Sequence, residues 1–229
     1  MSAIAIKLQA VQAQIRAAAE KAGRPPESIT LLAVSKTKPL ADILEAAEAG
    51  QRSFGENYVQ EGVDKIMAAV DQHLAWHFIG PLQSNKTRQV AEHFDWVHSI
   101  ERLKIAERLS AQRPANLPPL QVCVQVNVSG EASKSGCAPE EAEALCLAIT
   151  ALPNLQLRGL MAIPEPAEDS EAQRRPFRQL REIFEKIRAK GLPLDTLSMG
   201  MSHDLDAAIA EGATLVRIGT AIFGERNYA

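Results

Sequence analysis

Eight short apolar or β-branched runs recur along the chain, and patterns typical of helices lie between them. The runs cover residues 29–35, 52–56, 75–80, 95–100, 120–128, 155–163, 195–200 and 214–223. The clearest helical patterns cover residues 40–49, 139–152 and 177–190. A glycine closes the first and the last of these, and a proline with two glutamates opens the second. This alternation of strand and helix predicts a parallel sheet flanked by helices.

The number of strands separates the two parallel architectures. Eight strands with helices between them match a closed α/β barrel of the (β/α)8 TIM type. A doubly wound sheet is the alternative, but no GxGxxG follows the first run and no GxxxxGK[ST] occurs in the sequence. A length of 229 residues suits one barrel, and no Ser/Gly-rich linker interrupts it. We therefore expect a single domain over residues 1–229.

The two ends of the predicted barrel differ. Only "GERNYA" follows the eighth run, so we expect no helix after the last strand. Before the first run, Ile4, Leu8, Val11 and Ile15 recur at the spacing of an amphipathic helix that ends near Gly23. We expect this extra N-terminal helix to take the place of the missing helix in the outer ring.

Composition and spacing exclude several classes of protein. The net charge of −3 gives no global field that would attract nucleic acid or an anionic membrane. Cys123, Cys137 and Cys146 are an odd number without a CxxC pair, which fits a reducing compartment better than a disulfide or zinc framework. No apolar stretch is long enough to cross a bilayer and no leader with a cleavage site is present, so we expect a cytoplasmic protein. His73 and His77 lack the HExxH pattern, and we expect no metal site.

Polar residues collect where the predicted strands end, which is where barrels of this type carry their working residues. The residues are Lys36, Asn57, His77, Asn127, Lys134, Ser198, Ser202, Arg217, Gly219 and Thr220. The loops after strands seven and eight usually form the phosphate site of such barrels. Here "SMGMS" supplies a hydroxyl group, and "RIGT" supplies backbone N–H groups that a glycine lets an anion approach closely.

A strand-end lysine opposite a phosphate pocket suggests a phosphorylated aldehyde held as a Schiff base, because an unprotonated amine condenses with a carbonyl group. A lysine in water has a pKa of about 10.4, so Lys36 would need a dry or cationic setting, to which Lys38 and Arg217 could contribute. Each residue also has a purely structural interpretation. Lys36 could be a solvated strand exit, Arg217 a core ion-pair partner, Ser202 a helix N-cap and Gly219 a packing glycine. The convergence of all four on one predicted face favours a functional site.

Seven motifs resemble, in order, the signatures of the pyridoxal-phosphate homeostasis protein family, the single-domain relatives of alanine racemase. They are "AVSKTKP", "FGENYVQE", "WHFIGPLQSNK", "VNVSGEASKSG", "RGLMAIP", "LSMGMSHDLDAAI" and "VRIGTAIFG", and together they cover essentially the whole chain. The resemblance implies a fold-type-III barrel with pyridoxal 5′-phosphate (PLP) at its mouth. One local departure is His203, where the family pattern suggests an acidic or small residue.

The resemblance also implies roles for individual residues. Lys36 would form the internal aldimine with PLP, and Arg217 would face the pyridine nitrogen. Ser202 and the backbone of Gly219 and Thr220 would hold the phosphate. Asn57 would approach the side of the ring that carries the oxygen. His77 and Met199 are candidates for lining the pocket.

Whether such a protein is an enzyme depends on its second acid/base group. An arginine that faces the pyridine nitrogen keeps that nitrogen unprotonated and weakens the ring as an electron sink. Alanine racemase resembles this chain in having such an arginine, but its second acid/base is a tyrosine on an extra β-domain. Here the tyrosines are Tyr58 and Tyr228, and no such domain follows strand eight.

We therefore expect a monomer that stores, buffers or delivers PLP without robust turnover and meets apo PLP-dependent enzymes transiently. A PLP-dependent amino-acid racemase or isomerase is the first alternative, and a Schiff-base aldolase without PLP is the second. Lys38 would keep a lesser role, either favouring the reactive form of Lys36 or receiving departing cofactor.

Overall fold

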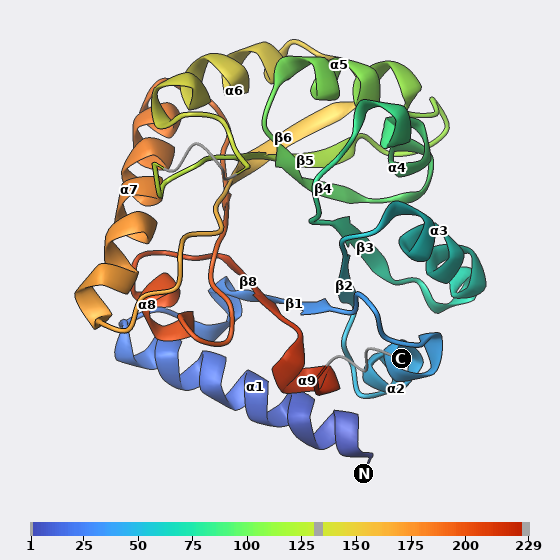
Figure 1. The fold of residues 1–229 in the computed structure, drawn as a ribbon, viewed down its shortest axis with the longest axis vertical. Coiled ribbons are helices and arrows are strands. Elements are labelled where there is room, and N and C mark those ends of the chain that lie inside the picture. The colour runs from blue at the N-terminus through green and yellow to red at the C-terminus, as the bar shows by residue number, and fades with distance from the viewer. Residues whose placement is uncertain (1, 131–134, 226–229) are drawn as a thin grey trace.

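Eight parallel strands close into a barrel in the computed structural model, which describes residues 2–130 and 135–225 (Figure 1). The strands follow one another around the barrel in chain order, and β1 closes it by pairing with both β2 and β8. They are β1 (Thr30–Val34), β2 (Ser53–Glu56), β3 (Ala75–Phe78), β4 (Trp96–Ile100), β5 (Leu120–Gln125), β6 (Leu155–Met161), β7 (Thr196–Ser198) and β8 (Leu215–Ile218). The predicted parallel barrel is confirmed. Lys134 and Tyr228 lie outside the described residues.

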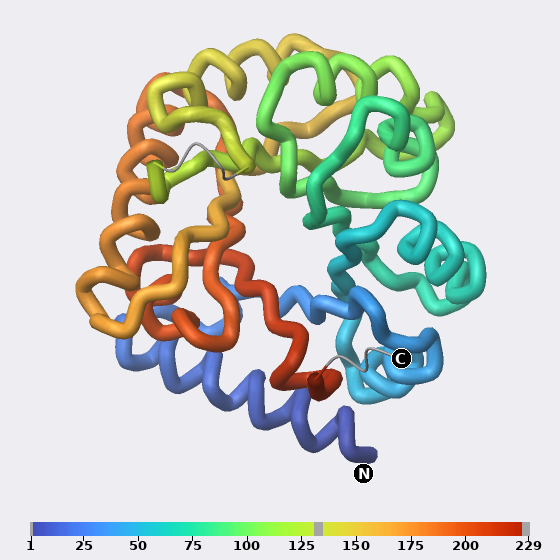
Figure 2. Tube along the Cα trace, in the orientation of Figure 1, coloured from blue at the N-terminus to red at the C-terminus, as the bar shows by residue number. Residues whose placement is uncertain are grey.

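Helices surround the barrel, and the path of the chain from strand to helix can be followed in Figure 2. They are α1 (Ala3–Lys21), α2 (Leu40–Glu48), α3 (Val59–Ala68), α4 (Thr87–His93), α5 (Leu103–Gln112), α6 (Ala142–Thr150), α7 (Ser170–Ala189), α8 (Leu205–Ala210) and α9 (Thr220–Phe223). Short 3₁₀ segments are η1 (Pro26–Ser28), η2 (Val70–Gln72), η3 (Ser84–Lys86) and η4 (Pro139–Glu141). Within the described part of the chain, no helix has the length and apolar character needed to cross a membrane.

The end of the barrel differs from the prediction that no helix follows the last strand. The apolar run 214–223 divides into β8 and the short helix α9. The backbone turns at Gly219, whose carbonyl oxygen accepts hydrogen bonds from the N–H groups of Ile222 and Phe223. Both side chains are buried. Two adjacent apolar residues suit a strand or a helix turn equally well, so the pattern alone could not locate the boundary.

The N-terminal helix α1 fills the gap in the outer ring, as expected. It packs against α2, α8 and α9, and Figure 1 shows it running along the last two. The hydroxyl oxygen of Ser2 caps the helix by accepting a hydrogen bond from the N–H group of Ala5. Ile4, Leu8, Val11 and Ile15 are all buried, so the predicted apolar face is the one that contacts the barrel. Burying each large aliphatic side chain stabilises the fold by about 1.5–3 kcal/mol.

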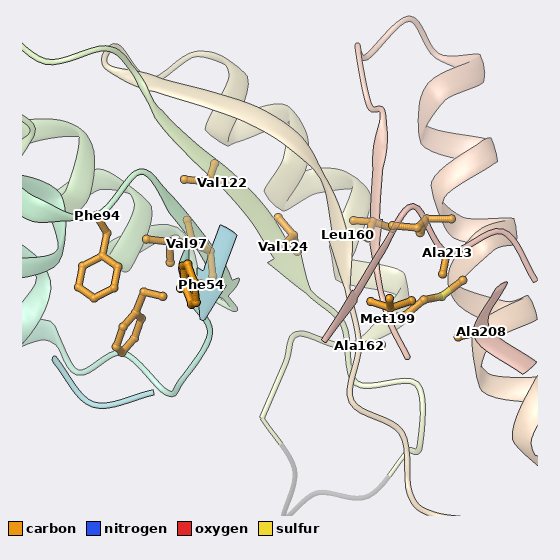
Figure 3. Close-up of a cluster of buried hydrophobic side chains, with 14 of the residues drawn as sticks. Phe54, Phe94, Val97, Val122, Val124, Leu160, Ala162, Met199, Ala208 and Ala213 are labelled. Carbon is orange, nitrogen blue, oxygen red and sulfur yellow. The ribbon is translucent and has the colours of Figure 1, made fainter. Parts of the chain in front are cut away.

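The main hydrophobic core lies between the strands and the surrounding helices. Figure 3 shows part of it, with Phe54 near Phe94 and, further along, Met199 beside Ala208 and Ala213. A separate apolar group is formed by Leu32, Val34, Ile79 and Leu215, from strands or strand ends that enclose the barrel interior. We call these four residues the inner cluster. It forms an apolar layer inside the barrel.

Candidate functional site

The inner cluster indicates where three of the predicted site residues point. Val34 of β1 and Leu215 of β8 belong to that cluster, and Gly55 of β2 lies against it. Side chains two positions further along a strand face the same way. Those positions are Lys36 after β1, Asn57 after β2 and Arg217 in β8. The guanidinium group of Arg217 therefore points to the inner side of the barrel. Lys36 and Asn57 lie just beyond the ends of their strands, and the alternation predicts the same direction for their amine and amide groups.

A buried ion pair supports the segment that carries Lys36. Glu56, at the end of β2, is fully buried, and its Oε1 accepts hydrogen bonds from Ser35 Oγ at 2.6 Å and Lys65 Nζ at 2.8 Å. Lys65 Nζ also donates to the carbonyl oxygen of Ser35 at 2.8 Å. Burial raises the pKa of Glu56, and the charge and hydrogen bond of Lys65 and the hydrogen bond of Ser35 oppose that rise. The residue just before Lys36 is thus held through both its side chain and its backbone.

Glu61 holds the residue just after Lys36. Its Oε1 accepts hydrogen bonds from the backbone N–H of Thr37 and from Lys65 Nζ, each at 2.6 Å. Thr37 has a φ of 63°, a left-handed conformation that is uncommon for a non-glycine residue. We call Ser35, Glu56, Glu61 and Lys65 the Lys65 cluster. It fixes both neighbours of the half-buried Lys36.

Arg217 is a buried cation inside the barrel. Its Nη1 donates to Ser198 Oγ at 2.8 Å and its Nη2 donates to the carbonyl oxygen of Ala162 at 2.9 Å. Burial lowers the pKa of Arg217 to about 10, so the group stays protonated at neutral pH. In residues 2–130 and 135–225 no carboxylate forms an ion pair with it, and the attraction of Asp204 acts from further away. The core ion pair considered above as an alternative role for Arg217 is therefore not found there.

The loop after β7 presents Ser202 to solvent. Gly200 has a φ of 101°, and a Cβ there would lie 2.6 Å from the Cβ of Ala208, so the position requires glycine. The buried Asp204 carboxylate accepts a hydrogen bond from the backbone N–H of Met201 at 2.6 Å and closes the loop. The N-cap of α8 is Asp204, so Ser202 does not have the capping role considered above.

Gly219 and Thr220 lie at the start of α9, directly after β8. A Cβ on Gly219 would be 3.1 Å from the carbonyl oxygen of Val34, which leaves little room for a side chain between β8 and β1. The first N–H groups of a helix have no partner within it and can bind an anion. The carboxyl ends of parallel strands meet at one end of the barrel, so these groups and Ser202 lie at the same end as Lys36.

Asn57 is positioned by a close backbone contact. A Cβ on Gly80 would lie 2.2 Å from the carbonyl oxygen of Asn57, so only glycine lets the two backbones approach in this way. The side-chain Oδ1 of Asn57 is buried and has no hydrogen-bond partner in the described residues. A buried, unpartnered polar atom is unfavourable unless something else completes its hydrogen bonding.

Two of the predicted lining residues lie elsewhere. Met199 follows the inward-facing Ser198, so it points outward into the hydrophobic core (Figure 3). His77 is buried in the barrel interior and lines a cavity of about 310 Å³ among the first residues of several strands, at the opposite end from Lys36. Neither lies at the proposed site. Met199 faces away from the barrel interior because its neighbour Ser198 faces inward, and His77 lies toward the opposite end of the barrel.

Sequence reasoning missed the residues that support the site rather than form it. Glu56, Glu61 and Lys65 reach the two neighbours of Lys36 because α3 folds back over the ends of β1 and β2. The one local signal is the i,i+4 spacing of Glu61 and Lys65, which usually marks a solvated pair. Lys38, considered as a helper of Lys36, donates instead to the carbonyl oxygen of Glu225 at 2.6 Å.

The arrangement suits a small organic ligand. It combines an amine, a buried guanidinium donor and an unpartnered amide oxygen with hydroxyl and backbone donors at the same end of the barrel. No group of three or more His, Cys, Asp or Glu side chains that could hold a metal ion occurs in the described part. An amine for a carbonyl group and donors for a phosphate and a ring acceptor define the chemistry that this end can bind.

Comparisons with known proteins identify the family of this chain. Residues 6–227 match the family described as "Alanine racemase, N-terminal domain". The "Pyridoxal phosphate homeostasis protein" of Pseudomonas aeruginosa is 64% identical over 228 residues, which span 100% of this chain and 98% of that protein. The chain belongs to the pyridoxal phosphate homeostasis protein family.

Solved structures place the family in a wider fold group. PipY of Synechococcus elongatus, solved with PLP bound, is 39% identical, covers 96% of this chain and 100% of its own, and superposes with a TM-score of 0.85. Alanine racemase from Corynebacterium glutamicum is 18% identical with a TM-score of 0.68, over 95% of this chain and 61% of its own. The second likeness shows the barrel fold alone.

Proposed function

We propose that this protein binds PLP covalently at the carboxyl end of its barrel and stores, buffers or delivers the cofactor in the cytoplasm, without robust catalytic turnover. The observation that carries the proposal is a buried, protonated Arg217 without a carboxylate partner in the described chain, on the same inner side of the barrel as Lys36. The relative with 64% identity and the PLP-bound PipY structure support the choice of cofactor.

Lys36 is the proposed covalent anchor. Its unprotonated Nζ attacks the aldehyde carbon of PLP, a C=N bond forms, and the aldehyde oxygen leaves as water. The Lys65 cluster fixes the residues on either side, which limits the orientations that the amine can adopt.

The other residues hold the non-reacting parts of the cofactor. Arg217 donates a hydrogen bond to the pyridine nitrogen and, as a group without acceptor capacity, leaves that nitrogen unprotonated. Ser202 and the backbone N–H groups of Gly219 and Thr220 bind the phosphate, and Asn57 lies toward the ring oxygen. PLP supplies an electron-withdrawing ring, and an unprotonated nitrogen makes that ring a weaker electron sink.

Among the described residues, Tyr58 is the tyrosine that could serve as a second acid/base, and its exposure favours a carrier over a racemase. Racemisation needs a proton donor on the face of the ring opposite the lysine. Tyr58, beside Asn57, is 53% exposed, so burial does not hold its ring over the barrel. The proposal also includes a monomeric single domain over residues 1–229 that contacts apo PLP-dependent enzymes only transiently and binds neither nucleic acid nor membranes.

Cofactor transfer tests the carrier function. Protein loaded with PLP is mixed with an apo PLP-dependent enzyme, and recovery of that enzyme's activity is followed beside free PLP at the same concentration. We expect transfer from the wild type and from Lys104→Ala, an exposed control on α5, and none from Lys36→Ala after removal of unbound PLP. A wild type that retains PLP indefinitely would contradict delivery.

Exchange in heavy water tests the racemase alternative. The loaded protein is incubated with a panel of L-amino acids in heavy water, and α-proton exchange is measured by NMR. We expect no exchange above that of free PLP. Exchange that depends on Lys36 and runs at about 1–10³ per second, the range of ordinary enzymes, would replace the carrier proposal with the racemase.

A further inference from the structure

A chain of hydrogen bonds runs from Arg217 through the barrel interior. Arg217 Nη1 donates to Ser198 Oγ at 2.8 Å, and Ser198 Oγ lies 2.8 Å from His98 Nδ1. His98 Nε2 lies 2.8 Å from His77 Nδ1. The four residues come from β8, β7, β4 and β3, and each is no more than 4% exposed. We call them the Arg217 relay.

Both imidazole rings in the relay are neutral. Burial lowers the pKa of His77 to about 3, and burial together with the charges of His77 and Arg217 lowers that of His98 well below its usual value. A neutral imidazole carries one N–H and one lone pair. One hydrogen therefore lies between the two rings, and its position decides the tautomer of each.

The donors and acceptors allow two directions. In the first, Ser198 accepts from Arg217 and donates its hydroxyl hydrogen to His98 Nδ1, and His98 Nε2–H then donates to His77 Nδ1. In the second, both histidines carry hydrogen on Nδ1 and Ser198 accepts from both sides. The second direction needs another acceptor for the Ser198 hydroxyl. Across the described residues, Ser198 Oγ makes hydrogen-bond contacts with Arg217 and His98 alone.

We propose that Ser198, His98 and His77 are positioning residues whose hydrogen bonds all run in one direction from Arg217. Both imidazoles carry their hydrogen on Nε2. This relay orients the guanidinium group as a donor toward an aromatic nitrogen acceptor in the site. The first direction pairs every hydrogen between Arg217 and His77. An unpaired buried hydroxyl is costly enough to disfavour the second direction by about tenfold or more.

The relay also strengthens the hydrogen bond between Arg217 and Ser198. A hydroxyl that donates to a histidine becomes a better acceptor, because hydrogen bonds in a chain polarise one another. Ser198 and the carbonyl oxygen of Ala162 therefore fix the two terminal nitrogens of Arg217. At the far end His77 stacks on Trp96, with ring centroids 5.1 Å apart and an interplanar angle of 10°. That contact fixes the last ring of the relay.

Nitrogen-15 NMR of histidine-labelled protein at about pH 8 tests the direction without any variant or cofactor. We expect hydrogen on Nε2 in both His98 and His77. His93 is an internal control of the opposite kind, because its Nδ1 lies 2.8 Å from the carbonyl oxygen of Gln89 and must donate to it. Hydrogen on Nδ1 of His98 would overturn the proposal.

Variants at Ser198 test the link to Arg217. Ser198→Ala should populate the two tautomers of His98 within a few-fold of each other, whereas Ser198→Thr, which keeps the hydroxyl, should retain the wild-type tautomer. An unchanged His98 tautomer in Ser198→Ala would overturn the relay. Should Ser198→Ala fail to fold, the wild-type spectrum still decides the direction.

The remaining part rests on the proposed function and uses PLP labelled with nitrogen-15 in the ring. We expect an unprotonated, hydrogen-bonded ring nitrogen in the wild type, and a shifted signal in Ser198→Ala because Arg217 is no longer fixed. An identical ring signal in both proteins would overturn the positioning role. Failure of the wild type to bind PLP would refute the proposed function alone, because the histidine tautomers are read in the cofactor-free protein.

Discussion

Replacing Lys65 with methionine tests whether the Lys65 cluster supports the reactive segment. The change removes the cation whose Nζ donates to Ser35, Glu56 and Glu61, and leaves the fully buried carboxylate of Glu56 with one donor, the hydroxyl of Ser35. Removing one partner of a buried pair costs about 3–5 kcal/mol. We expect the lower end, about 3 kcal/mol of unfolding free energy at about pH 8, because Ser35 stays and Glu56 can take up a proton.

The loss should depend on pH in a defined direction. Burial raises the folded-state pKa of Glu56 above its unfolded value, and Lys65 opposes that rise, so the pKa in Lys65→Met lies higher still. A carboxyl group with a raised folded-state pKa stabilises the fold fully below its unfolded pKa and loses that contribution as pH rises through the folded pKa. The variant should therefore lose less stability at about pH 5 than at about pH 8, by about 1.4 kcal/mol or more, which corresponds to one pKa unit.

Urea denaturation at the two pH values measures both effects, with Glu56→Gln and the double variant as matched controls. The double variant lacks the buried carboxylate, so it should be more stable than Lys65→Met at about pH 8 and should not show the extra pH dependence. An equal loss at both pH values, or a double variant no more stable than Lys65→Met, would refute this reasoning. PLP loading of Lys65→Met should also weaken, by about tenfold if the support of Lys36 is worth 1.4 kcal/mol.

Three further predictions concern a glycine next to Asn57, a buried carboxylate under α7 and the second lysine after β1. Gly80→Ala should lower the unfolding free energy by several kcal/mol in urea titrations, because the added Cβ would lie 2.2 Å from the carbonyl oxygen of Asn57. A decrease below about 1 kcal/mol, the ordinary scale of single substitutions, would be inconsistent with that contact. Glu211→Gln should lower the unfolding free energy by about 1.5–3 kcal/mol, because the buried carboxylate accepts hydrogen bonds from Arg174 and Arg178 and forms an ion pair with Arg181, and an unchanged denaturation midpoint would argue against these interactions. Lys38→Ala should change the rate of PLP loading or release, measured by stopped-flow absorbance, without abolishing covalent attachment, because the Lys38 amine donates a hydrogen bond to the carbonyl oxygen of Glu225. Complete loss of binding would show that Lys38, and not Lys36, is the covalent anchor.

The barrel itself could be predicted because its signals are local and repeated. Each strand is a short run with a hydrophobic side, and each helix has a recognisable period or end. Errors occurred where one pattern suits two structures, as in the run 214–223 that divides into β8 and α9. Boundaries of this kind depend on how Ile222 and Phe223 pack against the rest of the fold, which no local pattern records.

The candidate site could be proposed from the sequence for the same reason. Arg217 lies on a strand, and Lys36 and Asn57 follow strands whose ends the sequence marks. Met199 could have been rejected from alternation, because its neighbour Ser198 faces inward. The contact of Lys65 with the backbone of Ser35 could not have been predicted, since it forms only when α3 folds over the end of β1, 30 residues earlier in the chain.

The relay behind Arg217 joins residues up to 140 positions apart along the chain, from His77 to Arg217. Ser198 and Arg217 are 19 apart, but His98 and Ser198 are 100 apart. His98 alone is typical of a core histidine. The four side chains come within hydrogen-bonding distance only when the barrel closes. The sequence could therefore indicate Arg217 as a site residue but not the hydrogen bonds that connect it to the histidines.

Trapping the bound cofactor tests the central claim most directly. The protein is incubated with PLP, the C=N bond is reduced with borohydride, and the labelled peptide is located by mass spectrometry, with Lys36→Ala and Lys38→Ala treated in parallel. We predict one equivalent of label on Lys36, retained in Lys38→Ala and lost in Lys36→Ala. Label on another lysine in the wild type, or none at all, would contradict the assignment of Lys36 as the anchor of PLP.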